Sequence, residues 1–314
     1  MTTLKDVAKK ANVSKMTVSR VINHPELVTQ ELKDLVYQAM KELDYRPNTV
    51  AKALAKNRTL VVKVLILEEM DTTEPYFMNL VMGIAKELDR YQYALQLVTE
   101  NSLNLGDCDG YIITGMKEHD FEWIQKIKKP VVLFGENDYH IPYVDSNNQA
   151  ATRFATKYAK SCGYEKIQFI GIDVPEKFEA SREKGYLEAM ELMQLEANIT
   201  RIDNHSSSAA KLIENFDKWQ ENTCFICASD RIAIGIERQL LLEGKKIPDD
   251  YGIIGFDGVF LDQIAAPKLT TMKQDVVEMG KICVAQLMAL IEGEELTQKE
   301  MMHEAKMVVR GTTK

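Results

Sequence analysis

The sequence predicts two unlike parts: a small all-α helix-turn-helix head, followed by an α/β body of two doubly wound parallel-sheet lobes. Residues 4–43 carry apolar residues at the three- and four-residue spacing of short helices. From Leu60 onward, short apolar runs alternate with helical segments, as in parallel sheets that are covered on both faces. About 255 residues of this pattern exceed what one such sheet usually needs, so we expect two lobes.

Three short helices account for the head. Thr3 is placed to cap the first, with Asp6 at the capping-box position three residues later. Asn12-Val13 makes a turn, Ser14 caps the second helix and Thr29 caps the third. Helices this short are marginal alone, so we expect them to pack on one another. The positions expected to face inward are Leu4, Val7, Ala8 and Ala11, then Val18, Val21 and Ile22, and then Leu32, Leu35, Val36, Ala39, Met40 and Leu43.

The second helix of the head has a polar outer face. Its side chains are of the kinds that contact base edges and phosphates in DNA. The alternative is a small solvated bundle with ordinary polar surface residues. The outward side chains are Lys15, Met16, Thr17, Ser19, Arg20 and Asn23.

A second DNA-type element covers Asn48–Arg58. It is helix-prone, small and basic, with Val50 and Leu54 as its only larger apolar residues. It is too short and too weakly amphipathic to be a stable helix unaided, and coupled folding on a partner would explain it. A leucine on such a helix can act as a wedge in a minor-groove step. The alternative is a plain linker helix.

Charge is distributed unevenly along the 314 residues. Residues 1–60 hold eight lysines, three arginines and six acidic residues, a net charge of +5, while the whole chain carries −8, which leaves −13 for the body. A basic head on an acidic body fits nucleic-acid binding that weakens as salt rises. The N-terminus lacks the apolar core of a signal peptide, and no apolar run approaches membrane-spanning length. We therefore expect a cytoplasmic protein with no membrane contact.

The sequence gives little support for a metal-binding, redox or enzymatic function. Five cysteines are scattered, and Cys224 and Cys227 have metal-like spacing but no second pair nearby, in what reads as a buried strand. The five histidines are isolated. There is no Gly-x-Ser-x-Gly, no Walker loop and no dinucleotide glycine fingerprint. We expect no catalytic residue, no metal and no cofactor.

Four motifs in fixed order resemble the head of the LacI/GalR family of bacterial transcription regulators. They are Thr2–Ala8, Val13-Ser14, Thr17–Asn23 and Tyr45–Asn48. The resemblance implies a homodimer on a pseudo-palindromic operator in double-stranded DNA. Lys15-Met16 differs from the pair in the best-known members, which affects the operator sequence rather than the mode of binding. The DNA contacts implied are Leu4, Ser14, Lys15, Met16, Thr17, Ser19, Arg20, Asn23, Thr29, Asn48, Ala51, Lys52 and Leu54, with Leu54 entering the minor groove.

The body predicts one clear helix and a series of strands. The helix is expected at Tyr76–Tyr91. Only about a dozen residues join Thr99 to Tyr111, fewer than a parallel crossover with a full helix needs, so we expect a loop there and a thinner flank on the first lobe. The strands are expected at Val61–Leu67, Ala94–Thr99, Tyr111–Thr114, Val131–Phe134, Ile167–Ile170, Thr223–Ala228 and Gly252–Phe256.

The family resemblance extends more loosely over the body. It rests on segments such as Ser181–Tyr186, Ile254–Asp257 and Pro267–Gln274. It implies a periplasmic-binding-protein-like fold, with the chain crossing between lobes near Asp145, Met272 and Ala305. The implied domains are a DNA-binding head at 1–46, a hinge helix and linker at 47–59, and an effector-binding and dimerisation domain at 60–314. Lobe 1 would take about 60–144 and 273–304, and lobe 2 about 145–272 and 305–314.

The resemblance also suggests where an effector would bind. Open α/β sheets place ligands outside the carboxyl ends of their strands. Arg182 offers a planar fork of donors, and Asp257 ends a strand where a carboxylate can accept from two vicinal hydroxyls. The alternatives are a surface ion pair with Glu183 or Glu179 for the arginine, and a turn residue for the aspartate. The expected effector contacts are Tyr76, Phe77, Arg182, Ser229, Asp230, Phe256 and Asp257.

These expectations favour a transcription repressor of a carbohydrate-use operon. Its effector would be a sugar or a sugar phosphate bound between the lobes. One alternative is a cytoplasmic solute-binding receptor without a DNA role, and another is a Rossmann-like enzyme. The basic head argues against the receptor, and the missing cofactor loops argue against the enzyme.

Overall fold

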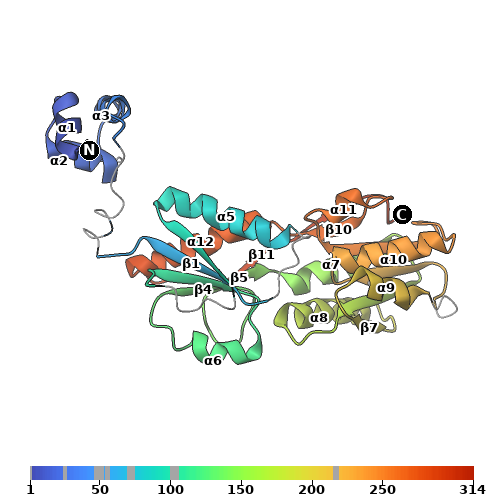
Figure 1. The fold of residues 1–314 in the computed structure, drawn as a ribbon. Helices are drawn as coiled ribbons and strands as arrows, with labels where there is room; N and C mark the ends of the chain where they lie inside the picture. The colour runs from blue at the N-terminus through green and yellow to red at the C-terminus, as the bar shows by residue number, and fades with distance from the viewer. Residues whose placement is uncertain are drawn as a thin grey trace. The chain divides into compact units, whose positions relative to one another are not determined.

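The computed structural model describes residues 2–23, 27–45, 53, 57–68, 75–99, 106–214 and 219–314. It divides into two compact units, Met1–Leu60 and Val61–Lys314, which Figure 1 shows in ribbon form. The predictions for Asn48, Ala51, Lys52 and Leu54 lie outside the described residues, as do those for the side chain of Asn23 and for most of the loop after Thr99.

The head is three helices, α1 (Leu4–Lys10), α2 (Lys15–Asn23) and α3 (Gln30–Glu42), as predicted. The Asp6 carboxylate accepts from the backbone N–H of Thr3 at 2.8 Å, which confirms the capping box. The Ser14 hydroxyl accepts from the N–H of Thr17 at 3.0 Å and caps α2 as expected. The head core holds Val7, Val18, Val21 and Val36, each fully buried.

Two details of α3 were predicted wrongly. Thr29 stands at the N-cap position, but its side chain makes no capping hydrogen bond. Leu35 is 45% exposed rather than buried. It precedes Val36, which is buried together with Ala39, and successive helix residues are rotated by about 100°. Leu35 therefore falls at the edge of the inward stripe.

Lobe 1 is built on an all-parallel sheet in the order β11-β5-β4-β3-β1-β2. Its strands are β1 (Val61–Ile66), β2 (Ala94–Thr99), β3 (Gly110–Thr114), β4 (Val131–Phe134), β5 (Tyr143–Ser146) and β11 (Glu300–His303). Helices α5 (Tyr76–Tyr91) and α12 (Val276–Glu292) cover one face, where Val62 and Val64 pack. The short helix α6 (Phe121–Ile124) covers the other, where Leu65 packs, because alternate strand residues face opposite ways.

Lobe 2 is built on a second sheet in the order β12-β10-β9-β8-β6-β7, parallel except for β12. Its strands are β6 (Lys166–Ile172), β7 (Ile199–Ile202), β8 (Thr223–Cys227), β9 (Tyr251–Asp257), β10 (Thr270–Lys273) and β12 (Lys306–Val308). Its helices are α7 (Asn148–Ser161), α8 (Lys177–Leu192), α9 (Ser206–Ile213), α10 (Asp230–Leu242) and α11 (Leu261–Ile264). Cys224 and Cys227 are buried free thiols in β8, as expected for a core strand.

The chain passes between the two sheets at three places, after β5, after β10 and after β11. These crossings are joined by side chains. The Ser146 hydroxyl at the first donates to Gln274 Oε1 at the second, at 2.5 Å. The Asn147 amide at the first donates to Glu304 Oε1 at the third, at 2.9 Å. The three connections therefore form one hydrogen-bonded hinge.

Candidate functional site

Helix α2 carries five of the eight predicted DNA contacts whose side chains the structure describes. Lys15, Met16 and Arg20 are exposed, Met16 by 70%, and no acidic residue lies in the first turn. Thr17 and Ser19 are half-buried. An unopposed helix N-terminus favours phosphate, so charge and dipole act together on this face.

Of three other predicted DNA contacts, Ser14 and Leu4 have structural duties in the head, and Thr29 has no capping hydrogen bond. The Ser14 hydroxyl is shared between the N–H of Thr17 and the Thr17 hydroxyl, 2.8 Å away. Leu4 is half-buried against the head core, and Thr29 is exposed at the start of α3.

Arg182 on α8 lies at the centre of the polar cluster in the body. Its Nε donates to Asn148 Oδ1 at 2.9 Å, and its Nη1 donates to the carbonyl of Ala228 at 2.6 Å. Its guanidinium carbon lies 3.8 Å from the ring centroid of Phe256, a close cation–π stack. The side chain is buried, so the alternative of a surface ion pair with Glu183 or Glu179 is wrong.

Asp257 ends β9 and stands beside this arginine. Its Oδ1 lies 4.0 Å from Arg182 Nη2 and accepts from Gln274 Nε2 at 2.8 Å. Its φ of 111° is unusual for a residue other than glycine, and such strain is held in place by surrounding contacts. One of these is the backbone N–H of Gln274, which donates to the Asp257 carbonyl at 2.9 Å.

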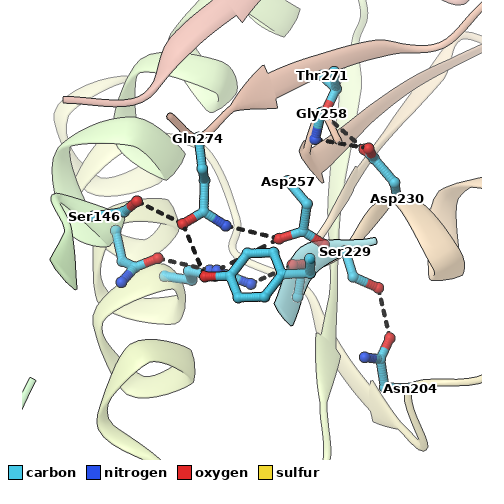
Figure 2. A network of polar contacts seen from close by, with 12 residues as sticks. Ser146, Asn204, Ser229, Asp230, Asp257, Gly258, Thr271 and Gln274 are labelled. Atoms are coloured by element: carbon cyan, nitrogen blue, oxygen red, sulfur yellow. Dashed lines mark hydrogen bonds and ion pairs between the residues drawn. The ribbon is translucent and has the colours of Figure 1, made fainter. Parts of the chain in front are cut away.

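Gln274 connects the two lobes. Its Oε1 accepts from Ser146 at 2.5 Å and from the Tyr76 hydroxyl at 3.5 Å, while its Nε2 reaches Asp257. Figure 2 shows Gln274 between Ser146 and Asp257. One hydrogen-bonded network therefore joins Tyr76 of lobe 1, the crossings after β5 and β10, and the end of β9 in lobe 2.

Ser229 and Asp230 are engaged with the protein itself. The Ser229 hydroxyl accepts from the N–H of Ile232 at 3.2 Å, which caps α10, and donates to Asn204 Oδ1 at 2.6 Å. Asp230 accepts from the Thr271 hydroxyl at 2.6 Å and from the N–H of Gly258 at 2.8 Å (Figure 2). Burial first, and then the Asp257 carboxylate, raise the pKa of Asp230 well above its usual range. In this geometry Asp230 braces the loop after β9.

Tyr76 and Phe77 are the first two residues of α5, and Tyr76 contacts the cluster through Gln274. The two rings meet edge to face at 5.5 Å, and Tyr76 also meets Phe134 at 6.3 Å. Burial, followed by the charges of Asp257 and Asp145, raises the pKa of Tyr76 well above normal, so its hydroxyl stays protonated and donates. Phe77 packs against the core of lobe 1, as expected for one of the pair.

The site includes three residues that sequence reasoning did not select: Asp145, Asn148 and Gln274. Asp145 accepts from the N–H groups of Glu136 and Ser146 at 2.9 and 2.6 Å, and Asn148 holds Arg182. Their position could have identified them as site residues, because each lies at or just after the carboxyl end of a strand.

Two broader classes of site can be examined in the described part of the chain. No helix there is long and apolar enough to cross a membrane. No group of three or more His, Cys, Asp or Glu side chains in the same residues is arranged to hold a metal ion.

Comparison with known proteins gives matches over both units. Residues 3–48 match the family described as bacterial regulatory proteins, lacI family, and residues 156–313 match the periplasmic binding protein-like domain. The chain is 53% identical to the uncharacterized HTH-type transcriptional regulator YvdE of Bacillus subtilis, over the full length of both. It is 32% identical to the ribose operon repressor of Halalkalibacterium halodurans, over all of this chain and 98% of that one.

Solved structures with similar folds cover nearly the whole chain. A transcriptional regulator CelR–cellobiose complex matches 99% of this chain and 100% of its own at a TM-score of 0.74 and 24% identity. The lac repressor dimer bound to operator and the anti-inducer ONPF matches 99% and 98%, also at 0.74, with 22% identity. At these identities the likeness is one of fold.

Proposed function

The chain belongs to the LacI family of bacterial regulatory proteins, and on that premise we propose that it represses a carbohydrate-use operon under the control of a sugar bound between its lobes. It is a DNA-binding transcriptional regulator with a helix-turn-helix head and an effector-binding body. Our proposal concerns the type of operon, the sugar effector, and the residues that contact the operator and the sugar.

The DNA half of the proposal rests on the exposed face of α2. Lys15, Met16 and Arg20 reach base edges in the major groove, and the half-buried Thr17 and Ser19 contact the backbone. The hinge segment adds further contacts from each subunit. The full proposed set is Leu4, Ser14, Lys15, Met16, Thr17, Ser19, Arg20, Asn23, Thr29, Asn48, Ala51, Lys52 and Leu54.

The effector half rests on one observation: Arg182, stacked on Phe256, stands 4.0 Å from the strand-end carboxylate Asp257. A carboxylate accepts from vicinal hydroxyls, a guanidinium donates to ring and hydroxyl oxygens, and an aromatic face such as Tyr76 packs on the C–H face of a sugar. The likeness to a regulator complexed with cellobiose and to a family member with bound ribose supports this class of ligand. Phe77 packs against the core of lobe 1, and Ser229 and Asp230 are hydrogen-bonded to protein groups, so we propose that these three hold the site in place rather than contact the sugar.

The signal would pass through the hinge. Gln274 touches Asp257 and also Ser146 at the first crossing, so a ligand on Asp257 acts directly on the segments that set the angle between lobes. An effector can shift the balance of two conformations only by its differential affinity for them. Closure by sugar would alter the dimer so that the two heads lose their shared register on DNA.

A homodimer supplies that pair of heads. Exposed apolar side chains on the body offer contact area for a second copy, among them Met78, which is 62% exposed, and Ile264, which is 59% exposed. Sedimentation of the full chain would test this, and a monomer at micromolar concentration would contradict it.

The proposal is tested by fluorescence anisotropy on DNA from upstream of the protein's own gene, with and without a panel of sugars. We expect tight binding to one promoter sequence, weak binding to random DNA, and release by at least one sugar. Binding that no sugar alters would remove the effector half of the proposal, and equal binding to random DNA would remove the operator half.

A further inference from the structure

A cavity of about 570 Å³ lies on lobe 2, next to the third crossing between the lobes. Its walls come from one face of α7, from the paired strands β10 and β12, and from the segment that joins β11 to β12. None of the seven proposed effector contacts lines it. We term it the α7 groove, and the residues that define it are Arg153, Phe154, Lys157, Met272, Lys306 and Met307.

Apolar side chains line part of the α7 groove. Met272 and Met307 lie opposite each other across β10 and β12, and both pack against the core of lobe 2. Phe154 precedes the buried Ala155 on α7 and is itself 56% exposed. Methionine adapts its shape and makes favourable contacts with aromatic rings, and an aromatic face packs well on another flat ring. The groove therefore suits a flat apolar body.

The charged side chains of the groove are mostly positive. Three cations line it, Arg153, Lys157 and Lys306, together with one carboxylate, Glu304, which gives the groove a net charge of +2 on a body that carries −13. Arg153 and Lys157 are one helical turn apart, so they stand on one face of α7 beside Phe154. A basic hollow on an acidic body indicates a local preference for an anion.

Two of these cations are uncommitted. Within the described residues, neither Lys157 nor Lys306 forms an ion pair or a side-chain hydrogen bond. Arg153 reaches Glu188 through Nη1 alone, at 3.3 Å. The Glu304 carboxylate accepts from an amide of the hinge at 2.9 Å, so one of its oxygens is already occupied. The free ammonium groups can therefore form charge-assisted hydrogen bonds with a bound anion.

The size and charge of the groove favour a small ligand as its occupant. Its volume falls within the roughly 300–1,000 Å³ of small-molecule sites. A second copy of the chain is disfavoured, because a twofold axis through the groove would bring its positive charge against itself. A flat apolar body that carries an anionic group describes a nucleotide or an aromatic carboxylic acid.

We propose that the α7 groove is a second ligand site, distinct from the sugar site, that binds a small aromatic anion. The aromatic part of the ligand packs on Phe154 and the two methionines, and its phosphate or carboxylate pairs with Lys157 and Lys306. Lobe 2 and the third crossing form this site, so binding there does not require a sugar between the lobes.

Isothermal titration calorimetry on the full-length protein tests the ligand class with two probes, adenosine monophosphate and indole-3-acetate. Each is compared with a neutral counterpart, adenosine or indole-3-acetamide, and with the anion alone, phosphate or acetate. We expect at least one probe to bind with a dissociation constant below about 1 mM, and at least about tenfold more tightly than both of its counterparts. The probe that does so identifies the ligand as a nucleotide or a carboxylic acid. Failure of both probes, or binding that does not need both the ring and the charge, overturns the proposal.

Matched variants on exposed helix positions place the bound probe in the groove. Lys157→Gln removes a groove cation and should weaken probe binding by about threefold or more, whereas Lys160→Gln removes the same charge from the same helix outside the groove and should have no effect. Phe154→Ala should also weaken binding by about threefold or more, whereas Leu192→Ala, at a 66% exposed position on α8, should not. Equal effects within either pair would overturn the assignment.

Two other occupants of the groove would be detected by the same proteins. Hexaglutamate that binds more tightly than both aromatic probes would assign the groove to an acidic protein segment. A Phe154→Ala protein that sediments as a smaller species than the wild type would assign the groove to a second copy of the chain. Either result would overturn the proposal of a small aromatic ligand.

Discussion

Arg20 is the side chain of α2 best suited to reading a base. It is exposed on the outer face, and its guanidinium can donate two parallel hydrogen bonds to one guanine. Arg20→Ala should therefore cost roughly 1–3 kcal/mol of specific binding. Anisotropy on the operator and on random DNA would measure this, with the loss expected mainly on the operator. An unchanged preference for the operator would remove Arg20 from the base contacts.

Asp257 is the side chain whose loss should separate effector response from DNA binding. Its φ of 111° would strain an alanine, so Asp257→Asn is the cleaner change, since asparagine tolerates positive φ and keeps the shape. We expect sugar affinity to fall by about tenfold or more because an ionised acceptor is lost. Operator affinity without sugar should stay within about twofold of wild type. Calorimetry that finds normal sugar affinity would exclude the carboxylate from the site.

Glu237 on α10 should give the body a measurable pH dependence. Burial raises the pKa of Glu237 to about 7. Between about pH 4.5 and 7 the folded protein holds a proton that the unfolded chain has lost, so the free energy of unfolding falls as pH rises through that window. Between pH 5 and pH 8, the free energy of unfolding of Glu237→Gln should fall by about 1–3 kcal/mol less than that of the wild type. Urea unfolding at both pH values measures this.

A matched control for that change is Glu191→Gln, which removes an exposed carboxyl from another helix of lobe 2. It should keep the wild-type slope of stability with pH. A Glu237→Gln protein with that same slope would show that the buried carboxyl does not titrate in this range.

Some residues of the site could be predicted from the sequence and others could not. Arg182, Phe256 and Asp257 were selected from the family resemblance, with the strand-end position of Asp257 in support, and the structure brings them together. Gln274 could not be predicted, because its role depends on Ser146, which is 128 residues away in the chain. Whether a hydroxyl such as that of Ser229 faces a ligand or caps a helix likewise depends on its tertiary partners.

Helices α7 and α8 form the support on which Arg182 is held. A Cβ at Gly185 would lie 2.1 Å from the carbonyl oxygen of Gln149, so the two helices pack with backbones in contact. Gly185→Ala must push them apart, and because the clash is with backbone it should cost about 3 kcal/mol or more. Because α8 carries Arg182, sugar affinity should fall as well. Urea unfolding and calorimetry on the same protein measure both effects.

Gly163→Ala is the matched control for that steric change. A Cβ there would meet nothing within 4 Å, although a φ of +86° makes alanine strained. We expect about 1 kcal/mol of destabilisation and unchanged sugar affinity. Equal losses of stability in the two variants would contradict the packing argument.

Elements with a strong pattern were predicted well. The helix Tyr76–Tyr91 and the strands Ala94–Thr99 and Val131–Phe134 were predicted with their observed bounds, because each is an apolar run or an amphipathic stripe with clear ends. The strands β5, β7, β10, β11 and β12 were not predicted. Each has only three or four residues and includes polar ones, so no period is visible. They complete the sheets, and β5, β10 and β11 lead into the hinge, which tertiary pairing alone defines.

At the scale of the whole molecule, we propose that an acidic two-lobed body controls a basic DNA-binding head. The head carries a net charge of +5 and the rest of the chain −13, so operator binding should weaken steeply with salt while sugar binding should not. We propose that two half-sites are held in register only while one arrangement of the paired bodies is favoured, and that the sugar favours the other arrangement.

The most direct test is the affinity of the full-length protein for its own promoter at a fixed salt concentration, measured across a titration of a sugar that binds it. We predict a sequence-specific complex whose affinity falls at least tenfold when the sugar saturates, with half the effect near the sugar's dissociation constant. Specific promoter binding that is indifferent to a sugar known to occupy the cleft would contradict the account.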